Sequence, residues 1–139
     1  MKKPNRVLLV DDDTLFTGLV KLNLEHTGRF EVCVVNDPLD ALTIARTFKP
    51  HIILLDVVMP TKDGGELLAE LESDAQLKNV PVLFLTASTM NQLARAEQAV
   101  VQGRPVIAKP VLPQELIRRL DEVLGRAIFD RLLSWCKKT

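Results

Sequence analysis

Residues 51–60 read HIILLDVVMP, in which four large aliphatic side chains run directly into one carboxylate, Asp56. A short apolar run without alternation is typical of a strand that is buried on both faces of its sheet. A sheet acquires two covered faces when helices cross over it in right-handed βαβ units. The stretch therefore predicts a central parallel strand with Asp56 at its carboxyl end.

Four similar apolar runs occupy residues 7–10, 32–35, 82–85 and 106–108. Apolar residues three and four apart fill the intervals and the segment after the last run, which predicts five helices. Strands that alternate with helices predict an α/β fold, here a doubly wound five-stranded parallel sheet with the flavodoxin-like order 2-1-3-4-5. In such a sheet the functional site lies at the carboxyl ends of the strands.

The first helix is expected to be capped by Asp13 and to carry two adjoining apolar rows, Leu15, Leu19 and Leu22 beside Phe16, Val20 and Leu24. The second opens at Asp37-Pro38, and the third follows Asp63-Gly64-Gly65, where we expect the glycines to provide backbone freedom. A weaker fourth helix is predicted at residues 88–101. The fifth begins near Pro113, and Gly125 is expected to end or bend it.

Composition excludes several classes of protein. A chain of 139 residues with 47% hydrophobic residues is long enough for one domain with its own core. Acidic and basic residues number 18 each, so there is no net attraction to nucleic acid or to an anionic membrane. No segment is apolar for long enough to serve as a secretory signal or to insert in a membrane, so we expect a cytoplasmic protein.

Charged or hydroxyl side chains follow four of the five predicted strands. Asp11 and Asp12 follow the first, Asp56 the third, Thr86 ends the fourth and Lys109 the fifth. In the order 2-1-3-4-5 these four strands are neighbours, so their side chains are expected to share one crevice. Carboxylates roughly 4 Å apart repel by about 4 kcal/mol at an effective dielectric of 20, so three of them need a cation. Mg²⁺ is the expected cation, because it binds carboxylate oxygens and bridges phosphate oxygens.

These motifs resemble the receiver domain of two-component response regulators: the acidic pair in VDDD, the acceptor in LLDVVMP, then LTA and AKP, in the expected order. The match spans roughly residues 5 to 124, so we expect a receiver domain at 1–124 and a C-terminal helical extension at 125–139. The resemblance implies a signalling domain, not an enzyme, although it assists its own phosphorylation and dephosphorylation.

The resemblance also implies a role for each matching residue. Asp56 would accept a phosphoryl group from a histidine kinase or a histidine phosphotransfer protein. Mg²⁺, with Mn²⁺ able to substitute, would be bound by Asp12, Asp56 and the backbone carbonyl of Val58, with Asp11 acting largely through water. Lys109 would pair with the phosphoryl oxygens, and the Thr86 hydroxyl would hydrogen-bond one of them. The signal would pass to an unknown downstream protein by protein contact, without direct nucleic acid binding.

Two positions depart from the family pattern. Val106 stands where most members carry a Tyr or Phe that rotates inward as the threonine moves, and valine cannot perform that rotation. Val58 is an apolar side chain beside the acceptor, where it could alter the access of water and hence the lifetime of the phosphate. The first departure leaves open a receiver-like interaction module with little or no phosphotransfer.

The C-terminal segment places Ile128, Leu132 and Trp135 on one apolar stripe, with Phe129, Leu133 and Cys136 adjoining. Three options stay open for it: packing on its own domain, formation of a homodimer or docking to another protein, and a linker toward an output domain. A phosphatase of the haloacid dehalogenase type is a weaker alternative for the whole chain. Its D-x-D-x-T pattern, begun at Asp11, requires threonine at position 15, where Leu15 stands.

Overall fold

The computed structural model describes residues 3–87 and 104–138. Its sheet has five parallel strands, in the order β2-β1-β3-β4-β5. This order confirms the predicted flavodoxin-like topology. The strands are β1 (Asn5–Val10), β2 (Phe30–Val35), β3 (Ile52–Asp56), β4 (Val82–Ala87) and β5 (Val106–Lys109).

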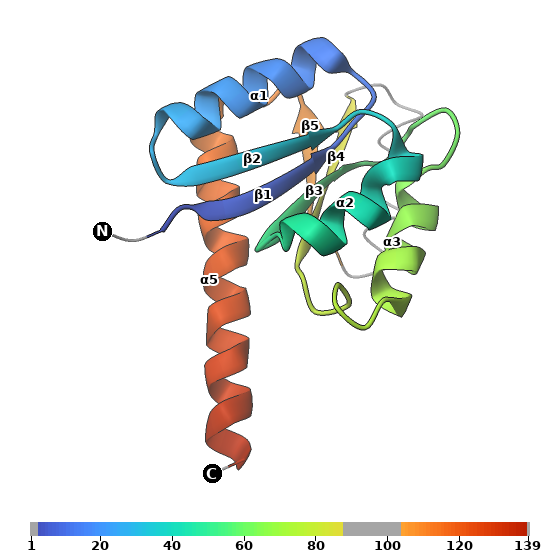
Figure 1. The fold of residues 1–139 in the computed structure, drawn as a ribbon. Helices are drawn as coiled ribbons and strands as arrows, with labels where there is room; N and C mark the ends of the chain where they lie inside the picture. Colours follow the sequence, from blue (N-terminus) through green and yellow to red (C-terminus); the bar gives the residue numbers. More distant parts are fainter. Residues whose placement is uncertain (1–2, 88–103, 139) are drawn as a thin grey trace.

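Helices cover both faces of this sheet (Figure 1). On one face, α2 (Ala41–Phe48) and α3 (Gly64–Ser73) pack Ala45 and Leu67 into a cluster with Leu55 and Phe84. On the other, α1 (Thr14–His26) and α5 (Pro113–Lys138) pack against the opposite sides of the same strands. Every residue of β3 is buried, as the continuous apolar run at 52–55 predicts.

Helix α1 buries a different side from the one that its leucines suggest. Asp13 caps it as predicted, by accepting a hydrogen bond from the backbone N–H of Phe16. Leu15, Leu19 and Leu22 are nevertheless exposed, and the buried residues are Thr17, Val20 and Leu24. The Thr17 hydroxyl can be buried because it bonds the Thr14 carbonyl and the Asn36 side chain, so the leucine row is left facing solvent.

The other helix boundaries follow local capping. A short 3₁₀ turn, η1 (Pro38–Asp40), precedes α2. Asp37 caps this turn by accepting a hydrogen bond from the backbone N–H of Leu39. Asp63 caps α3 through the N–H of Glu66. The helix predicted at residues 88–101 lies outside the described residues.

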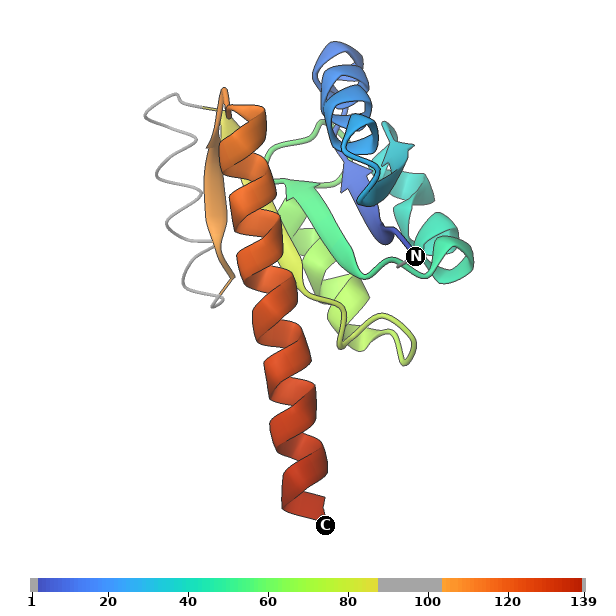
Figure 2. The same ribbon diagram turned by 90° about the vertical axis from the view of Figure 1, so that its left-hand side faces the viewer.

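Helix α5 runs through Gly125 without ending there, contrary to one expectation for this glycine. Figures 1 and 2 show its C-terminal half extending past the edge of the sheet as a free-standing rod. The boundary between a domain at 1–124 and an extension at 125–139 stays a prediction, since one helix crosses it. None of the helices within 3–87 and 104–138 is both long enough and apolar enough to cross a bilayer.

Candidate functional site

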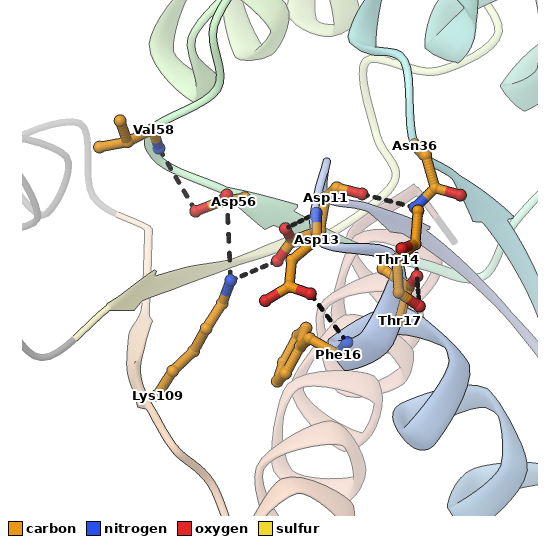
Figure 3. Close-up of polar contacts among 9 residues, drawn as sticks. All are labelled: Asp11, Asp13, Thr14, Phe16, Thr17, Asn36, Asp56, Val58 and Lys109. Carbon is orange, nitrogen blue, oxygen red and sulfur yellow. Dashed lines mark hydrogen bonds and ion pairs between the residues drawn. The ribbon is translucent and has the colours of Figure 1, made fainter.

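Four charged or hydroxyl side chains lie at the carboxyl edge of the sheet, where the parallel strands end. Asp11 directly follows β1, Asp56 ends β3, Thr86 is the penultimate residue of β4 and Lys109 ends β5. The register pairs Thr86 with Ala108 and Ala87 with Lys109, so the last two strands end at the same level. Figure 3 shows Asp11, Asp56 and Lys109 pointing toward one another.

Three carboxylates form an acidic cluster at this edge. Oxygen atoms of Asp11, Asp12 and Asp56 all lie within 4.8 Å of one another. Asp11 is fully buried and Asp56 is 6% exposed, whereas Asp12 is exposed and lies toward solvent. The predicted metal-ligating side chains are therefore brought together, two of them at the floor of the site and one at its opening.

Lys109 is the cation of the cluster, and it lies closer to Asp11 than to Asp56. Its Nζ atom contacts Asp11 Oδ2 directly and is 3.9 Å from Asp56 Oδ2. The same ammonium group lies 4.3 Å from the centre of the Phe16 ring, a favourable cation–π distance. The sequence predicts that Lys109 faces Asp56, but it gives no sign of the contacts with Asp11 and Phe16.

The negative charge of ionised Asp56 is not balanced by the positive charge and hydrogen-bond donors around it. Burial and the neighbouring Asp11 carboxylate raise the pKa of Asp56 to about 7, with a smaller contribution from Asp12. The Lys109 ammonium and the Val58 N–H, which donates to Asp56 Oδ1 at 3.3 Å, act in the opposite direction and do not cancel the rise. One lysine is thus insufficient for three carboxylates.

This arrangement fits a hard divalent cation. The donor set consists of carboxylate oxygens, which Mg²⁺ prefers. Burial first, and the Asp11 carboxylate second, raise the pKa of Asp56, and a divalent cation would relieve both by compensating the charge of the ionised carboxylate. Soft nitrogen or sulfur ligands are not part of the cluster, which argues against a zinc site.

The loop that carries Asp11 is held by a residue that the sequence does not single out. Asn36 follows β2, the strand to which no chemistry is assigned, and its side-chain amide donates to the Asp11 backbone carbonyl at 2.8 Å and to the Thr17 hydroxyl at 3.1 Å. Asp11 Oδ1 also accepts a hydrogen bond from the Asp13 N–H at 2.9 Å. These bonds fix the direction in which the Asp11 carboxylate points. In the sequence, the only indication of this role for Asn36 is that an amide residue directly follows a predicted strand.

Gly64 is required for close approach, not for backbone freedom as the sequence suggests. A Cβ atom at this position would lie 2.5 Å from the Asp56 carbonyl oxygen and 3.0 Å from the Val57 Cα atom. The Gly64 N–H donates to the Val57 carbonyl at 2.9 Å. The first residue of α3 is thereby packed against the backbone of the acidic cluster.

The remaining predicted positions surround this cluster. Thr86 is almost fully buried in β4. Val58 and Val106 are half-buried, and both pack against the apolar cluster that contains Phe84. Val106 pairs with Phe84 across β4 and β5, so a valine occupies the position expected to carry a rotating aromatic ring.

Known proteins share this fold and this sequence pattern. The family model for the response regulator receiver domain matches residues 7–121. The polar-differentiation response regulator DivK of Brucella anthropi is 31% identical, over 89% of this chain and 99% of its own length. The transcriptional regulatory protein TrcR of Mycobacterium tuberculosis is 35% identical, over 89% of this chain and 47% of its own. Several curated relatives are likewise about twice as long as the part that this chain matches.

A solved structure agrees with these matches. The Vibrio cholerae chemotaxis protein CheY4 superposes with a TM-score of 0.75 at 28% identity, covering 86% of this chain and 98% of its own. Family model, relatives and structure all indicate the same family. The chain therefore belongs to the response regulator receiver family, the phosphoryl-accepting domains of two-component signal transduction.

Proposed function

We propose that Asp56 is the phosphoryl acceptor of this receiver. The observation that carries the proposal is the position of its carboxylate, nearly buried at the end of the central strand, beside the Asp11 carboxylate and 3.9 Å from Lys109 Nζ. A carboxylate oxygen would attack phosphorus in the phosphohistidine of a partner, forming an O–P bond as the P–N bond breaks. The departing imidazole takes up a proton and leaves as neutral histidine.

Asp11, Asp12 and Asp56 would hold Mg²⁺ or Mn²⁺, together with the backbone carbonyl of Val58. When bound, the ion neutralises negative charge on the carboxylates and on the phosphoryl oxygens. Lys109 contacts Asp11 in this structure, and we propose that it turns from Asp11 to the phosphoryl group during transfer. The buried Thr86 hydroxyl would bond a phosphoryl oxygen, while the Val58 N–H holds Asp56 Oδ1 in place.

The donor would be a histidine kinase or a histidine phosphotransfer protein in the cytoplasm. We propose that it docks on the exposed row of Leu15, Leu19 and Leu22 on α1, because this helix begins beside the acidic cluster and Asp13 fixes its first turn. The phosphorylated protein would then act on a downstream protein by contact. It would remain a signalling domain that assists its own phosphorylation and dephosphorylation.

A small phosphodonor tests the chemistry apart from the docking. Wild-type protein incubated with acetyl phosphate and Mg²⁺ should gain the mass of one phosphoryl group, and hydroxylamine, which cleaves acyl phosphates, should remove it. Asp56→Asn is the matched control and should gain nothing. If neither acetyl phosphate nor a cognate kinase gives an adduct, the chain is a receiver-like interaction module.

A further inference from the structure

A second cavity lies at the amino ends of the strands, opposite the acidic cluster. Its volume is about 710 Å³, and its walls come from the residues at the starts of β3, β4 and β5 and from the C-terminal half of α5. Figure 2 shows how α5 continues past this end of the sheet. A cavity of this size can enclose a small organic ligand. We call it the basal cavity, and the proposed phosphoryl transfer uses none of its residues.

Much of the lining of the basal cavity is apolar and stiff. Pro50, Pro81 and Pro105 stand one or two residues before three neighbouring strands and contribute their rings to it. Val82 and Val123 also belong to this apolar part of the lining. Proline rings are rigid, so this surface exists before a ligand arrives. It suits the planar or apolar part of a ligand, which gains free energy when it leaves water.

The same prolines argue against a bound peptide. Proline has no backbone N–H, and the N–H of His51, which follows Pro50, already donates to the Arg6 carbonyl at 2.8 Å. The carbonyls of Pro81 and Pro105 already accept hydrogen bonds from neighbouring strands. A peptide that binds through its backbone needs free backbone groups on the other side. These positions offer it no N–H, so the cavity favours a small molecule that side chains recognise.

The charged side chains that line the basal cavity are mostly cationic. They are three guanidinium groups and one carboxylate: Arg104, Arg126, Arg131 and Asp130. Acidic and basic residues are equal in number over the whole chain, so this excess of positive charge is local. Arg104 bonds Glu72 and Arg126 bonds Glu122, each at 2.9 Å. A guanidinium group has five N–H donors, so each of these arginines keeps donors for a ligand.

Arg131 is the cation best placed to bind an anion. Within 3–87 and 104–138 its guanidinium group makes no ion pair with a carboxylate. His51 also lines the cavity, and burial, followed by the charges of Arg6 and Arg131, lowers its pKa. The neutral ring carries its proton on Nε2, because Nδ1 accepts a hydrogen bond from the Arg6 N–H at 2.8 Å. The cavity thus combines an unpaired guanidinium group with a neutral N–H donor.

We propose that the basal cavity binds a nucleotide, with its phosphate groups on Arg131 and Arg104 and its base on the proline surface. Guanidinium groups bind phosphate oxygens through paired N–H donors, which suits them to this role. A free phosphate ion would fill only a small part of the cavity and leave its apolar lining in water. A nucleotide uses both parts of the lining, and it would tie the C-terminal half of α5 to the sheet.

Titration calorimetry of the full chain tests the proposal. The protein, in EDTA, is titrated with four nucleoside diphosphates, with the matching nucleosides and with pyrophosphate. At least one nucleoside diphosphate should bind with a dissociation constant below about 1 mM, and its nucleoside and pyrophosphate should each bind at least ten-fold more weakly. If none of the four binds, if pyrophosphate binds as tightly, or if a glutamate-rich peptide binds more tightly than all of them, the proposal is wrong.

Variants place the ligand in this cavity. Arg131→Gln should weaken binding at least ten-fold, whereas Arg118→Gln, which removes a charge from the same helix outside the cavity, should not change it. Both arginines are exposed, and circular dichroism shows whether each variant is folded. Asp56→Asn should bind the nucleotide as wild type does, so a failure of phosphoryl transfer leaves this test intact. Equal affinities of Arg131→Gln and wild type, or ligand-induced NMR shifts confined to the acidic cluster, would overturn the proposal.

Discussion

Replacing Asp56 with asparagine should stabilise the metal-free protein, and the gain should grow with pH. The folded protein holds Asp56 at a pKa of about 7, against a model value of 3.8. Between these values the folded state binds more protons at Asp56 than the unfolded state, so the contribution of Asp56 to stability falls as pH rises from about 4 to 7. The rise corresponds to an upper limit on the order of 4 kcal/mol. The asparagine side chain keeps an oxygen that can accept from the Val58 N–H, but it carries no charge.

Urea unfolding in EDTA, from pH 4.5 to 8, measures this difference. The free energy of unfolding of Asp56→Asn should exceed that of wild type by roughly 1–3 kcal/mol at pH 8, because coupling to Asp11 and local relaxation reduce the upper limit. The difference should shrink to about a quarter of that value at pH 4.5, since the unfolded Asp56 has a pKa of 3.8. Adding Mg²⁺ should stabilise wild type more than the variant and narrow the gap. A difference between the two proteins that does not vary with pH would refute the view that the buried negative charge of Asp56, beside that of Asp11, opposes folding.

Three further outcomes follow from the same geometry. Mg²⁺ should raise the melting temperature of wild type, and less so that of Asp12→Ala, in a thermal shift assay; equal shifts would remove Asp12 from the ligand set. Gly64→Ala should lower the free energy of unfolding by about 1–3 kcal/mol, because its Cβ would meet the Asp56 carbonyl at 2.5 Å. Gly18→Ala, whose Cβ would meet nothing within 4 Å, serves as the control in the same urea titration. Leu19→Glu should slow phosphotransfer from a cognate kinase but not from acetyl phosphate; loss of both would indicate a folding defect, not a docking defect.

The sheet and the members of the site could be predicted from the sequence because both depend on short stretches of chain. Each buried strand is a continuous apolar run, and Asp11, Asp56 and Lys109 each stand directly beside such a run. Once the strands are parallel, these neighbours in sequence must meet at one edge. The approximate gathering of the carboxylates follows from this, whereas the strand order was predicted from the five βα units together with the resemblance to receiver domains.

What the sequence did not reveal depends on contacts between distant segments. The buried side of α1 is decided by Thr17, whose hydroxyl is satisfied by Asn36 from another strand end. The need for glycine at position 64 comes from the backbone of Asp56, and Lys109 contacts Asp11 and the Phe16 ring, both from the distant N-terminal segment. Neither the spacing of apolar residues nor the residue types indicate these contacts between distant segments.

The central claim is that the carboxyl edge of the sheet gathers oxygen ligands around a divalent ion so that Asp56 attacks phosphorus. Peptide mapping of the phosphorylated protein, after reaction with acetyl phosphate in Mg²⁺ or in EDTA, tests it most directly. One modified site at Asp56, formed in Mg²⁺ and absent in EDTA, is the predicted result. A phosphoryl group on Asp12 or Asp11, or equal modification of Asp56 without a divalent ion, would contradict the account.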